Sequence, residues 1–422
     1  MKSFVRRLAS RCPRRLWARG RLDIGWSDLL FALRAPLLAG ATPRRVWPTK
    51  REHIAMHSVR TAWDALLCTQ QWPKGSEIIV SEANIPDMIR LIELNGFVPV
   101  AVPINPHTLE VEEGAVEAAI SERTRAILLS PLFGARMNLE GISAVARRHN
   151  LLLVEDNAQG FSDTSFQGAP EADVALFSFG LIKTRTALGG AVVFARDESL
   201  LKALENRSRH YARVPTKEFY MRVARAIGLQ CLAQPLLFRV FWRVLEWRGI
   251  NPDVWLSKMA RGMGGGDLLV AVRRRPHRAT LKLLRRRLRE ENNSQMNWRI
   301  RRGQASLNAL PGTLGREADY GFFWALLVMV KEREALIERA RQKGFDISFR
   351  TSSLACHGAQ DTTFSRAMGR AIFLPISNPM PDGEWGRLIE IVRDFCEEEY
   401  ASQVALSGRV DASARLDATV EL

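Results

Sequence analysis

The chain has 422 residues, of which 46% are hydrophobic and 25% are charged. This composition excludes a globally disordered chain, and the length suits a large domain plus a smaller one. The chain has 61 lysines and arginines against 45 aspartates and glutamates, so the formal net charge is +16. A charge of that size indicates an anionic partner, which could be a phosphate group, a nucleic acid or an acidic membrane surface.

The five cysteines are scattered without a CxxC pair, and no histidine cluster has the spacing of metal ligands. We therefore expect a reducing compartment and no structural metal. No uncharged apolar run reaches the roughly 18 to 20 residues that a membrane-spanning helix needs. A cytoplasmic protein is expected, either soluble or peripheral on the inner face of a membrane.

Residues 1–53 have the composition of a basic amphipathic extension. The first 50 residues hold twelve lysines and arginines against two aspartates, which supplies +10 of the net charge, and apolar side chains such as Trp17 and Trp26 are interleaved with them. Such a segment can lie on an anionic membrane face, although a solvated arm or a packing extension explains it equally well. Its arginine-rich start also fits an organellar transit peptide.

Residues 54–206 are predicted to form the large domain, because short apolar runs alternate there with helix-like segments. This pattern favours a mostly parallel sheet that helices cover on both faces, with ligands at the carboxyl ends of the strands. The strand candidates are 77–80, 98–102, 126–129, 151–154, 174–178 and 191–195, and the helix candidates are 59–69, 86–95, 112–121 and 139–149.

Residues 207–300 are rich in arginine and aromatic side chains and are predicted to be a helical insertion and linker. The most apolar stretch, 236–245, has the character of a membrane-facing or dimer-packing helix. The glycines at 262–266 predict a flexible break before a basic helix at about 279–289.

Residues 301–402 are predicted to form a small C-terminal α+β domain. Its strand candidates are 322–330 and 371–375, and its helix candidates are 332–343 and 384–400. The tail at 403–422 lacks periodicity, and we expect it to be disordered.

Carboxylates and a lysine follow two apolar runs of the large domain. The run 151–154 ends in Glu155 and Asp156, and the run 174–178 is followed by Lys183. A carboxylate at the end of a buried strand is costly unless it meets a cation or a ligand. In pyridoxal chemistry a carboxylate keeps the pyridine nitrogen protonated and a partly desolvated lysine forms the covalent link, so the pair points to that cofactor.

A phosphate-binding turn is predicted immediately before the helix at 59–69. Ser58 offers a hydroxyl, Val59 a backbone N–H and Arg60 a cation, and a helix N-terminus binds phosphate. Ser58 by itself is as well explained as an ordinary N-cap. His57 is interpreted as a structural or hydrogen-bonding histidine and is not assigned to the catalytic set.

These motifs resemble the DegT/DnrJ/EryC1/StrS family of fold-type-I, pyridoxal-phosphate-dependent aminotransferases, which aminate keto groups of nucleotide-linked sugars. The resemblance covers residues 54 to about 200 and, more loosely, 270–400. The segment 155–159 matches the family's Glu-Asp-Ala-Ala-Gln at four of five positions. Residues 178–183 match its Ser-Phe-His-Pro-Thr-Lys at the ends, and Gly-Gly-Ala follows at 189–191.

The resemblance assigns a role to each of these positions. It makes Lys183 the catalytic Schiff-base lysine and proton shuttle, Asp156 the partner of the pyridine nitrogen and Gln159 a contact on the phenolic oxygen side. The cofactor phosphate would be held by Ser178, by Ser58 and by the N–H of Val59. It further implies a homodimer with the site at the interface.

Three departures from the family pattern concern the substrate side. Residues 81–85 lack the aromatic ring that usually lies over the cofactor, so stacking falls to Ile85 or to another residue. The segment 184–188 is one residue short and lacks an acid. The Asn-Tyr-Arg segment by which the partner subunit usually touches the phosphate is replaced by the residues at 274–278.

The sequence therefore predicts an aminotransferase that moves an amino group, with glutamate as the expected donor, to a keto group of a sugar-type or lipid-linked acceptor. An anionic membrane surface is a further expected partner, whereas no nucleic-acid-binding motif is present. Another pyridoxal reaction, such as elimination, deoxygenation or condensation, stays open, as does a non-catalytic regulator or membrane scaffold.

Overall fold

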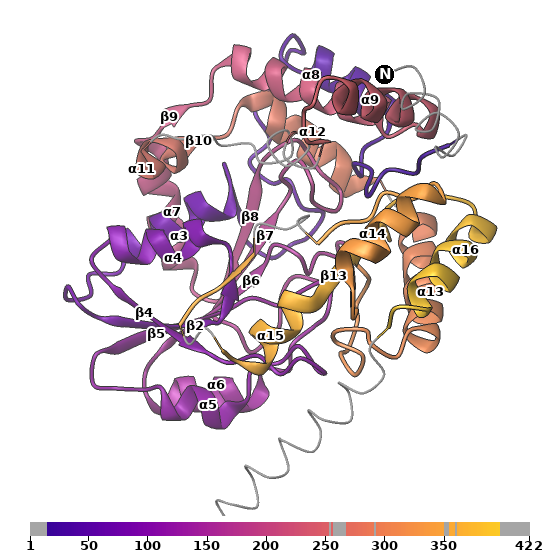
Figure 1. Cartoon of the computed structure of the whole chain (residues 1–422). Helices are drawn as coiled ribbons and strands as arrows, with labels where there is room; N and C mark the ends of the chain where they lie inside the picture. Colours follow the sequence, from indigo (N-terminus) through magenta and orange to yellow (C-terminus); the bar gives the residue numbers. More distant parts are fainter. Residues whose placement is uncertain are drawn as a thin grey trace, which may run out of the picture.

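The fold was analysed in a computed structural model of the chain, which describes residues 15–252, 255, 267–290, 293–349, 354–358 and 361–396. Figure 1 shows a large α/β part, a smaller part built from the last third of the chain, and a group of helices at one end. The predicted break at 262–266 and the predicted tail at 403–422 lie outside the described residues.

A seven-stranded sheet forms the centre of the large part, in the order β1-β8-β7-β6-β5-β2-β4. Strands β4, β2, β5, β6 and β7 are parallel, whereas β8 is antiparallel to β7 and β1 is antiparallel to β8. The predicted mostly parallel sheet is confirmed. The strands are β1 (Ile54–Met56), β2 (Glu77–Ser81), β4 (Val98–Val102), β5 (Thr124–Leu129), β6 (Leu152–Asn157), β7 (Val174–Ser178) and β8 (Ala191–Ala195).

Helices cover both faces of this sheet, as the continuous apolar strands require. Ile78 and Val80 point into one apolar cluster and Ile79 into the other, since alternate residues of a strand face opposite sides. The first cluster contains α3 (Val59–Thr69), α4 (Pro86–Leu94) and α7 (Glu198–Arg209), and the second contains α5 (Glu113–Ala118) and α6 (Glu140–Arg148).

A helical group covers the β7–β8 side of the sheet and lies at the top of Figure 1. It is built from α2 (Trp26–Arg34), α8 (Thr216–Leu232), α9 (Pro235–Trp247) and α12 (Arg278–Arg289). Trp47 packs against Phe177 and Phe194 with ring centroids 5.1 Å away in each case. Residues 15–53 therefore include side chains of the main core.

The smaller part contains β11 (Leu326–Met329), which pairs antiparallel with β13 (Ala371–Leu374). Around this pair lie α13 (Asn293–Ala309), α14 (Arg333–Gln342), α15 (Thr363–Arg370) and α16 (Asp382–Arg393). The strand predicted at 322–330 is shorter because its first residues pair with a loop: the Trp324 N–H donates to the Phe133 carbonyl at 2.8 Å. The helix predicted at 384–400 ends at Arg393, and residues 397–400 lie outside the described range.

Short elements complete the chain: β3 (Ala83–Asn84) pairs with β12 (Ala355–Cys356), β9 (Ala212–Arg213) pairs with β10 (Arg274–Arg275), and α11 (Leu268–Val272) precedes β10. Within the described ranges, no helix is long and apolar enough to cross a membrane. The same ranges hold no group of three or more potential metal ligands among His, Cys, Asp and Glu.

Candidate active site

The carboxyl ends of β1, β6 and β7 lie at one edge of the sheet, as the paired residues of neighbouring strands show. Ala191, the first residue of β8, is the partner of Ser178 at the end of β7 and of Met56 at the end of β1. Asp156, near the end of β6, pairs with Leu176 of β7. The sheet therefore brings the Ser58 turn, the Asp156 strand and the loop that carries Lys183 to a single crevice.

Asp156 is a buried carboxylate that has little support from the protein. Its side chain accepts a hydrogen bond from the Ala158 N–H at 3.0 Å, and no other described residue donates to it. Burial raises the pKa of Asp156 to about 6, against a smaller opposite effect of the Lys183 charge. A carboxylate in this state suits a buried cationic ligand atom.

Lys183 lies in the loop between β7 and β8, where its N–H donates to the Gly180 carbonyl at 3.0 Å. Burial lowers the pKa of Lys183 to about 8, while the charge of Asp156 opposes this shift and that of Arg60 adds to it. The lysine is thus much closer to its neutral, nucleophilic form at neutral pH than an ordinary lysine.

The Ser58 turn begins α3 as the sequence predicted. The Ser58 hydroxyl accepts from the Thr61 N–H at 3.1 Å, so it is the N-cap, while Val59 is the first residue of the helix. The N-cap role and a phosphate-binding role are compatible, because the N–H groups of the first turn still point outward.

Three arginines of this chain surround His57 beside that turn. Burial and then the charges of Arg222, Arg274 and Arg60 lower the pKa of His57 to about 3. The Arg222 guanidinium lies 3.3 Å from His57 Nε2, and both Arg222 and Arg274 also pair with Glu218, at 2.8 Å and 2.7 Å. Arg274 belongs to the segment in which the sequence departs from the family pattern, and Arg222 carried no signal in the sequence.

Two further predicted residues lie at the same edge. Ser178 is the last residue of β7 and is partly exposed. Gln159 is buried just beyond β6, and its side-chain carbonyl accepts from the Phe133 N–H at 2.9 Å. The Gln159 amide group is therefore fixed in orientation by its bond to the main chain.

The aromatic ring next to the lysine comes from the smaller part of the chain. Lys183 Nζ lies 4.9 Å from the centroid of the Trp324 ring. Ile85, the other residue considered for stacking, is the N-cap of α4 and packs against the apolar cluster beneath it. Sequence reasoning missed Trp324, because it was interpreted as part of a strand.

The crevice fits pyridoxal 5'-phosphate by the chemistry of its donors. A buried carboxylate, a lysine with a lowered pKa and a helix N-terminus with nearby arginines match the cofactor's ring nitrogen, aldehyde and phosphate.

Residues 48–230 match the DegT/DnrJ/EryC1/StrS aminotransferase family. The match covers 183 of the 422 residues of the chain. The match confirms the predicted family, and the family's enzyme class and cofactor are those predicted, an aminotransferase that depends on pyridoxal phosphate.

Solved structures show the same fold at low sequence identity. An aminotransferase from Psychrobacter cryohalolentis is 16% identical, with a TM-score of 0.59 over 87% of this chain and 96% of its own. The sugar aminotransferase CalS13 from Micromonospora echinospora is 18% identical, with a TM-score of 0.54 over 89% and 93%. The E. coli GDP-4-keto-6-deoxy-D-mannose-3-dehydratase with bound hydrated PLP is 13% identical, with a TM-score of 0.63 over 90% and 100%.

Proposed function

We propose that this protein transfers an amino group from glutamate to a keto group of a sugar-type or lipid-linked acceptor, with pyridoxal phosphate as cofactor. The observation that carries the proposal is the pairing of Asp156 and Lys183 at adjacent strand ends, with the pKa of the acid raised and that of the amine lowered. The name of CalS13, a sugar aminotransferase of the same fold, supports the sugar-type acceptor.

Six residues of this chain would hold the cofactor. Asp156 would keep a proton on the ring nitrogen, Gln159 would contact the phenolic oxygen side, and Lys183 would form the covalent link. The phosphate would be taken by Ser58, Ser178 and the N–H of Val59. When bound, pyridoxal phosphate supplies an aldehyde that reacts with amines and a ring that takes up electrons from a deprotonated carbon.

Lys183 would also move the proton in each half of the reaction. A pKa of about 8 lets its Nζ accept a proton from a carbon of the donor and return it without a large energetic cost at neutral pH. Arg60, whose charge acts on Lys183 and whose guanidinium also pairs with Asp87, suits the α-carboxylate that every amino-acid donor carries.

The absorbance of the protein tests this function. With pyridoxal phosphate the protein should be yellow, and glutamate should shift the absorbance to that of the pyridoxamine form. Lys183→Ala should lose the yellow colour. A yellow protein whose absorbance glutamate fails to shift would favour elimination, deoxygenation or condensation. A colourless preparation would favour a non-catalytic regulator or scaffold.

We further propose that the helical group lies on the surface of an anionic membrane, on the cytoplasmic side. Its support is a row of exposed apolar side chains on α9, namely Leu236, Leu237, Val240, Val244 and Trp247, with Trp26, Leu30 and Leu33 exposed on α2. α8 contacts both helices. A chain with net charge +16 suits an acidic lipid surface.

Sedimentation with liposomes distinguishes this surface from a protein contact. Binding to vesicles with acidic lipid at low salt, reduced by Leu237→Asp and Val240→Asp, is expected. A homodimer, which the family resemblance implies, should persist in these variants when measured by light scattering. If the variants become monomeric and the vesicles never bind the protein, the helical face belongs to the dimer.

A further inference from the structure

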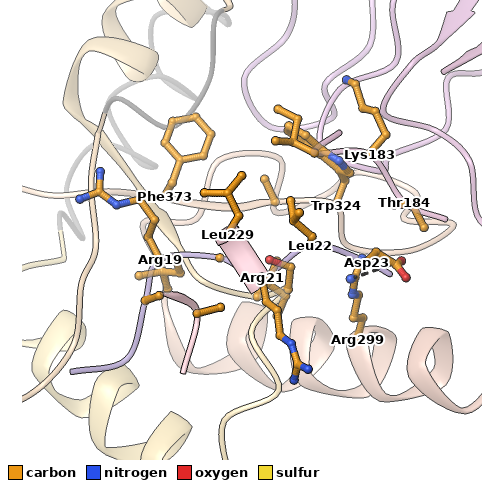
Figure 2. Close-up of a pocket in the computed structure, with 18 of the residues that line it drawn as sticks. Arg19, Arg21, Leu22, Asp23, Lys183, Thr184, Leu229, Arg299, Trp324 and Phe373 are labelled. Carbon is orange, nitrogen blue, oxygen red and sulfur yellow. Dashed lines mark ion pairs between the residues drawn. The ribbon is translucent and has the colours of Figure 1, made fainter. Parts of the chain in front are cut away.

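A largely apolar pocket of about 230 Å³ lies directly behind the lysine loop. It is formed by residues 18–23, the end of α8, the start of α9, the 182–184 loop, α13, Trp324 and the β13 region. In Figure 2 the Lys183 side chain points away from Leu22, Leu229 and Arg299, whereas Lys183 and Trp324 both line the pocket. The cofactor site described above does not account for this space.

Apolar side chains make up much of the pocket lining, together with the charged residues Arg19, Arg21 and Arg299. Leu22, Leu229, Leu232 and Phe238 line the pocket, and Figure 2 shows Leu22 and Leu229 side by side there. The apolar part of the lining favours hydrocarbon groups of a ligand, because water there finds few hydrogen-bond partners.

A polar end lies next to the lysine loop. Arg299 and Thr184 line the pocket there, close to Asp23 in Figure 2. Arg299 is 3% exposed, and its single ion pair among the described residues, to Asp23, is long at 3.6 Å. Arg299 Nε and Thr184 Oγ1 are buried without hydrogen-bond partners in the described structure. A buried guanidinium with so little pairing is costly, so this end suits an anionic group.

Asp23 cannot satisfy Arg299 alone because other groups share it. Arg287 donates to Asp23 Oδ1 at 3.1 Å, and the Arg185 N–H donates to Asp23 Oδ2 at 3.2 Å. The one carboxylate thus serves two guanidinium groups and a main-chain N–H. An additional negative charge at this point would be stabilising.

We propose that this pocket binds the hydrocarbon chain of an acidic lipid-type acceptor, with the acceptor's phosphate or carboxylate beside Arg299 and Thr184. Thr184 directly follows Lys183, so an acidic group there would link a chain in the pocket to a keto group presented to the lysine. The outer faces of α9 and α2 carry the exposed apolar side chains described above, which gives a lipid chain an apolar approach. The assignment of the ligand as the acceptor rests on the proposed function, whereas the binding itself does not.

Fluorescence of dansylaminoundecanoic acid, which combines an apolar chain with a carboxylate, tests this site in the purified full-length protein. We expect saturable binding at one site per chain, displaced by dodecyl phosphate and by laurate below their micelle concentrations. Inorganic phosphate alone should not displace it. Comparison of dodecyl phosphate with laurate shows whether phosphate or carboxylate is the preferred acidic group.

Two variants and a matched control locate the binding. Ala233→Trp fills the pocket and should lower the affinity for the probe by about tenfold or more. Ala224→Trp, at an exposed position of α8, should change that affinity by about twofold or less. Arg299→Met should weaken dodecyl phosphate about tenfold while leaving neutral monolaurin unchanged. The unfolding temperature of each variant shows whether it is folded, and Arg299→Met tests the site even if Ala233→Trp is not.

The outcomes separate this site from the proposed function. Absence of saturable binding, or equal binding by Ala233→Trp and the control, overturns the lipid pocket even if glutamate shifts the cofactor absorbance. Saturable binding with no glutamate shift keeps the pocket and removes the aminotransferase assignment. If Arg299→Met lowers the affinity for dodecyl phosphate and for neutral monolaurin equally, the placement of the acidic group beside Arg299 is overturned.

Discussion

Lys183 of the large part and Trp324 of the smaller part are in contact, with the lysine Nζ 4.9 Å from the centroid of the indole ring. The face of an indole ring attracts a cation, which favours the protonated amine, while burial favours the neutral one. Burial lowers the pKa of Lys183 to about 8, and the charge of Asp156 opposes this shift. The smaller part thus contributes directly to the chemistry of the lysine.

Replacing the ring should therefore lower the pKa of Lys183. Trp324→Leu keeps the site apolar but removes the aromatic face, so the pKa should fall by about half a unit, which corresponds to ~0.7 kcal/mol. The pH dependence of Lys183 acylation in cofactor-free protein, followed by peptide mapping, measures this pKa. Trp324→Phe, which retains a ring, should lie between the two. A rise in Trp324→Leu would mean that water enters the site.

Acylation of Lys183 in the unaltered protein has its own pH signature. Because burial lowers the pKa from 10.5 to about 8, the amine becomes neutral as pH rises through about 8, and the rate should increase there. Surface lysines of the same sample, with ordinary pKa values, should reach half-maximal rate about two pH units higher. A common midpoint for all lysines would contradict the burial of Lys183.

Asp156→Asn should change both the amine and the activity. The Asp156 charge raises the pKa of Lys183, so its removal should lower that pKa further below 8. Loss of the carboxylate that would hold the ring proton should reduce turnover by about 100-fold or more. Asp163→Asn, a half-exposed carboxylate outside the crevice, is the control. Unchanged turnover in Asp156→Asn would remove Asp156 from its proposed role.

The arginines beside the Ser58 turn should strengthen binding of a phosphate. Arg222→Ala and Arg274→Ala should each weaken pyridoxamine phosphate about tenfold, because a hydrogen bond to a charged group contributes about 1.5 kcal/mol or more. Binding of pyridoxamine without phosphate should be unaffected. Arg275→Ala is a control from the same segment, since its guanidinium donates to the Arg209 carbonyl instead. Equal effects on both ligands would indicate a structural role.

Sequence reasoning reached the sheet and the lysine because their signals are local. The runs at 174–178 and 191–195 coincide with strands of the structure, since continuous apolar residues mark strands buried on both faces, and the run at 98–102 coincides with the partly exposed edge strand β4. Trp324 and Arg222 could not be found in this way. Each reaches the crevice from a distant part of the chain, and only tertiary packing brings them to Lys183 and His57.

His57 shows what burial among cations does to stability. Its pKa is lowered from 6.5 to about 3, so the folded protein keeps it neutral while the unfolded chain protonates it below about pH 6.5. Its contribution to stability is therefore present above pH 6.5 and is lost as pH falls towards 3, by up to about 1.4 kcal/mol per pH unit. His57→Gln should flatten the acid side of the stability curve measured by urea unfolding. NMR titration should show no His57 protonation above about pH 5, and a midpoint near 6.5 would contradict the cationic surroundings.

Trp47 tests whether the basic N-terminal extension is part of the core. Its indole ring is 2% exposed, packs against Phe161, Phe177 and Phe194, and donates a hydrogen bond to the Thr164 carbonyl at 2.8 Å. Trp47→Ala should lower the free energy of unfolding by about 3 to 5 kcal/mol, as large aromatic truncations in cores do. Trp26→Ala, where the ring is 47% exposed, is the matched control and should change the free energy of unfolding by about 0.5 kcal/mol or less.

Because Trp26 belongs to the exposed apolar face, its loss should instead weaken liposome binding, so the two tryptophans separate stability from membrane contact within one segment. Equal loss of stability in both variants would contradict that division.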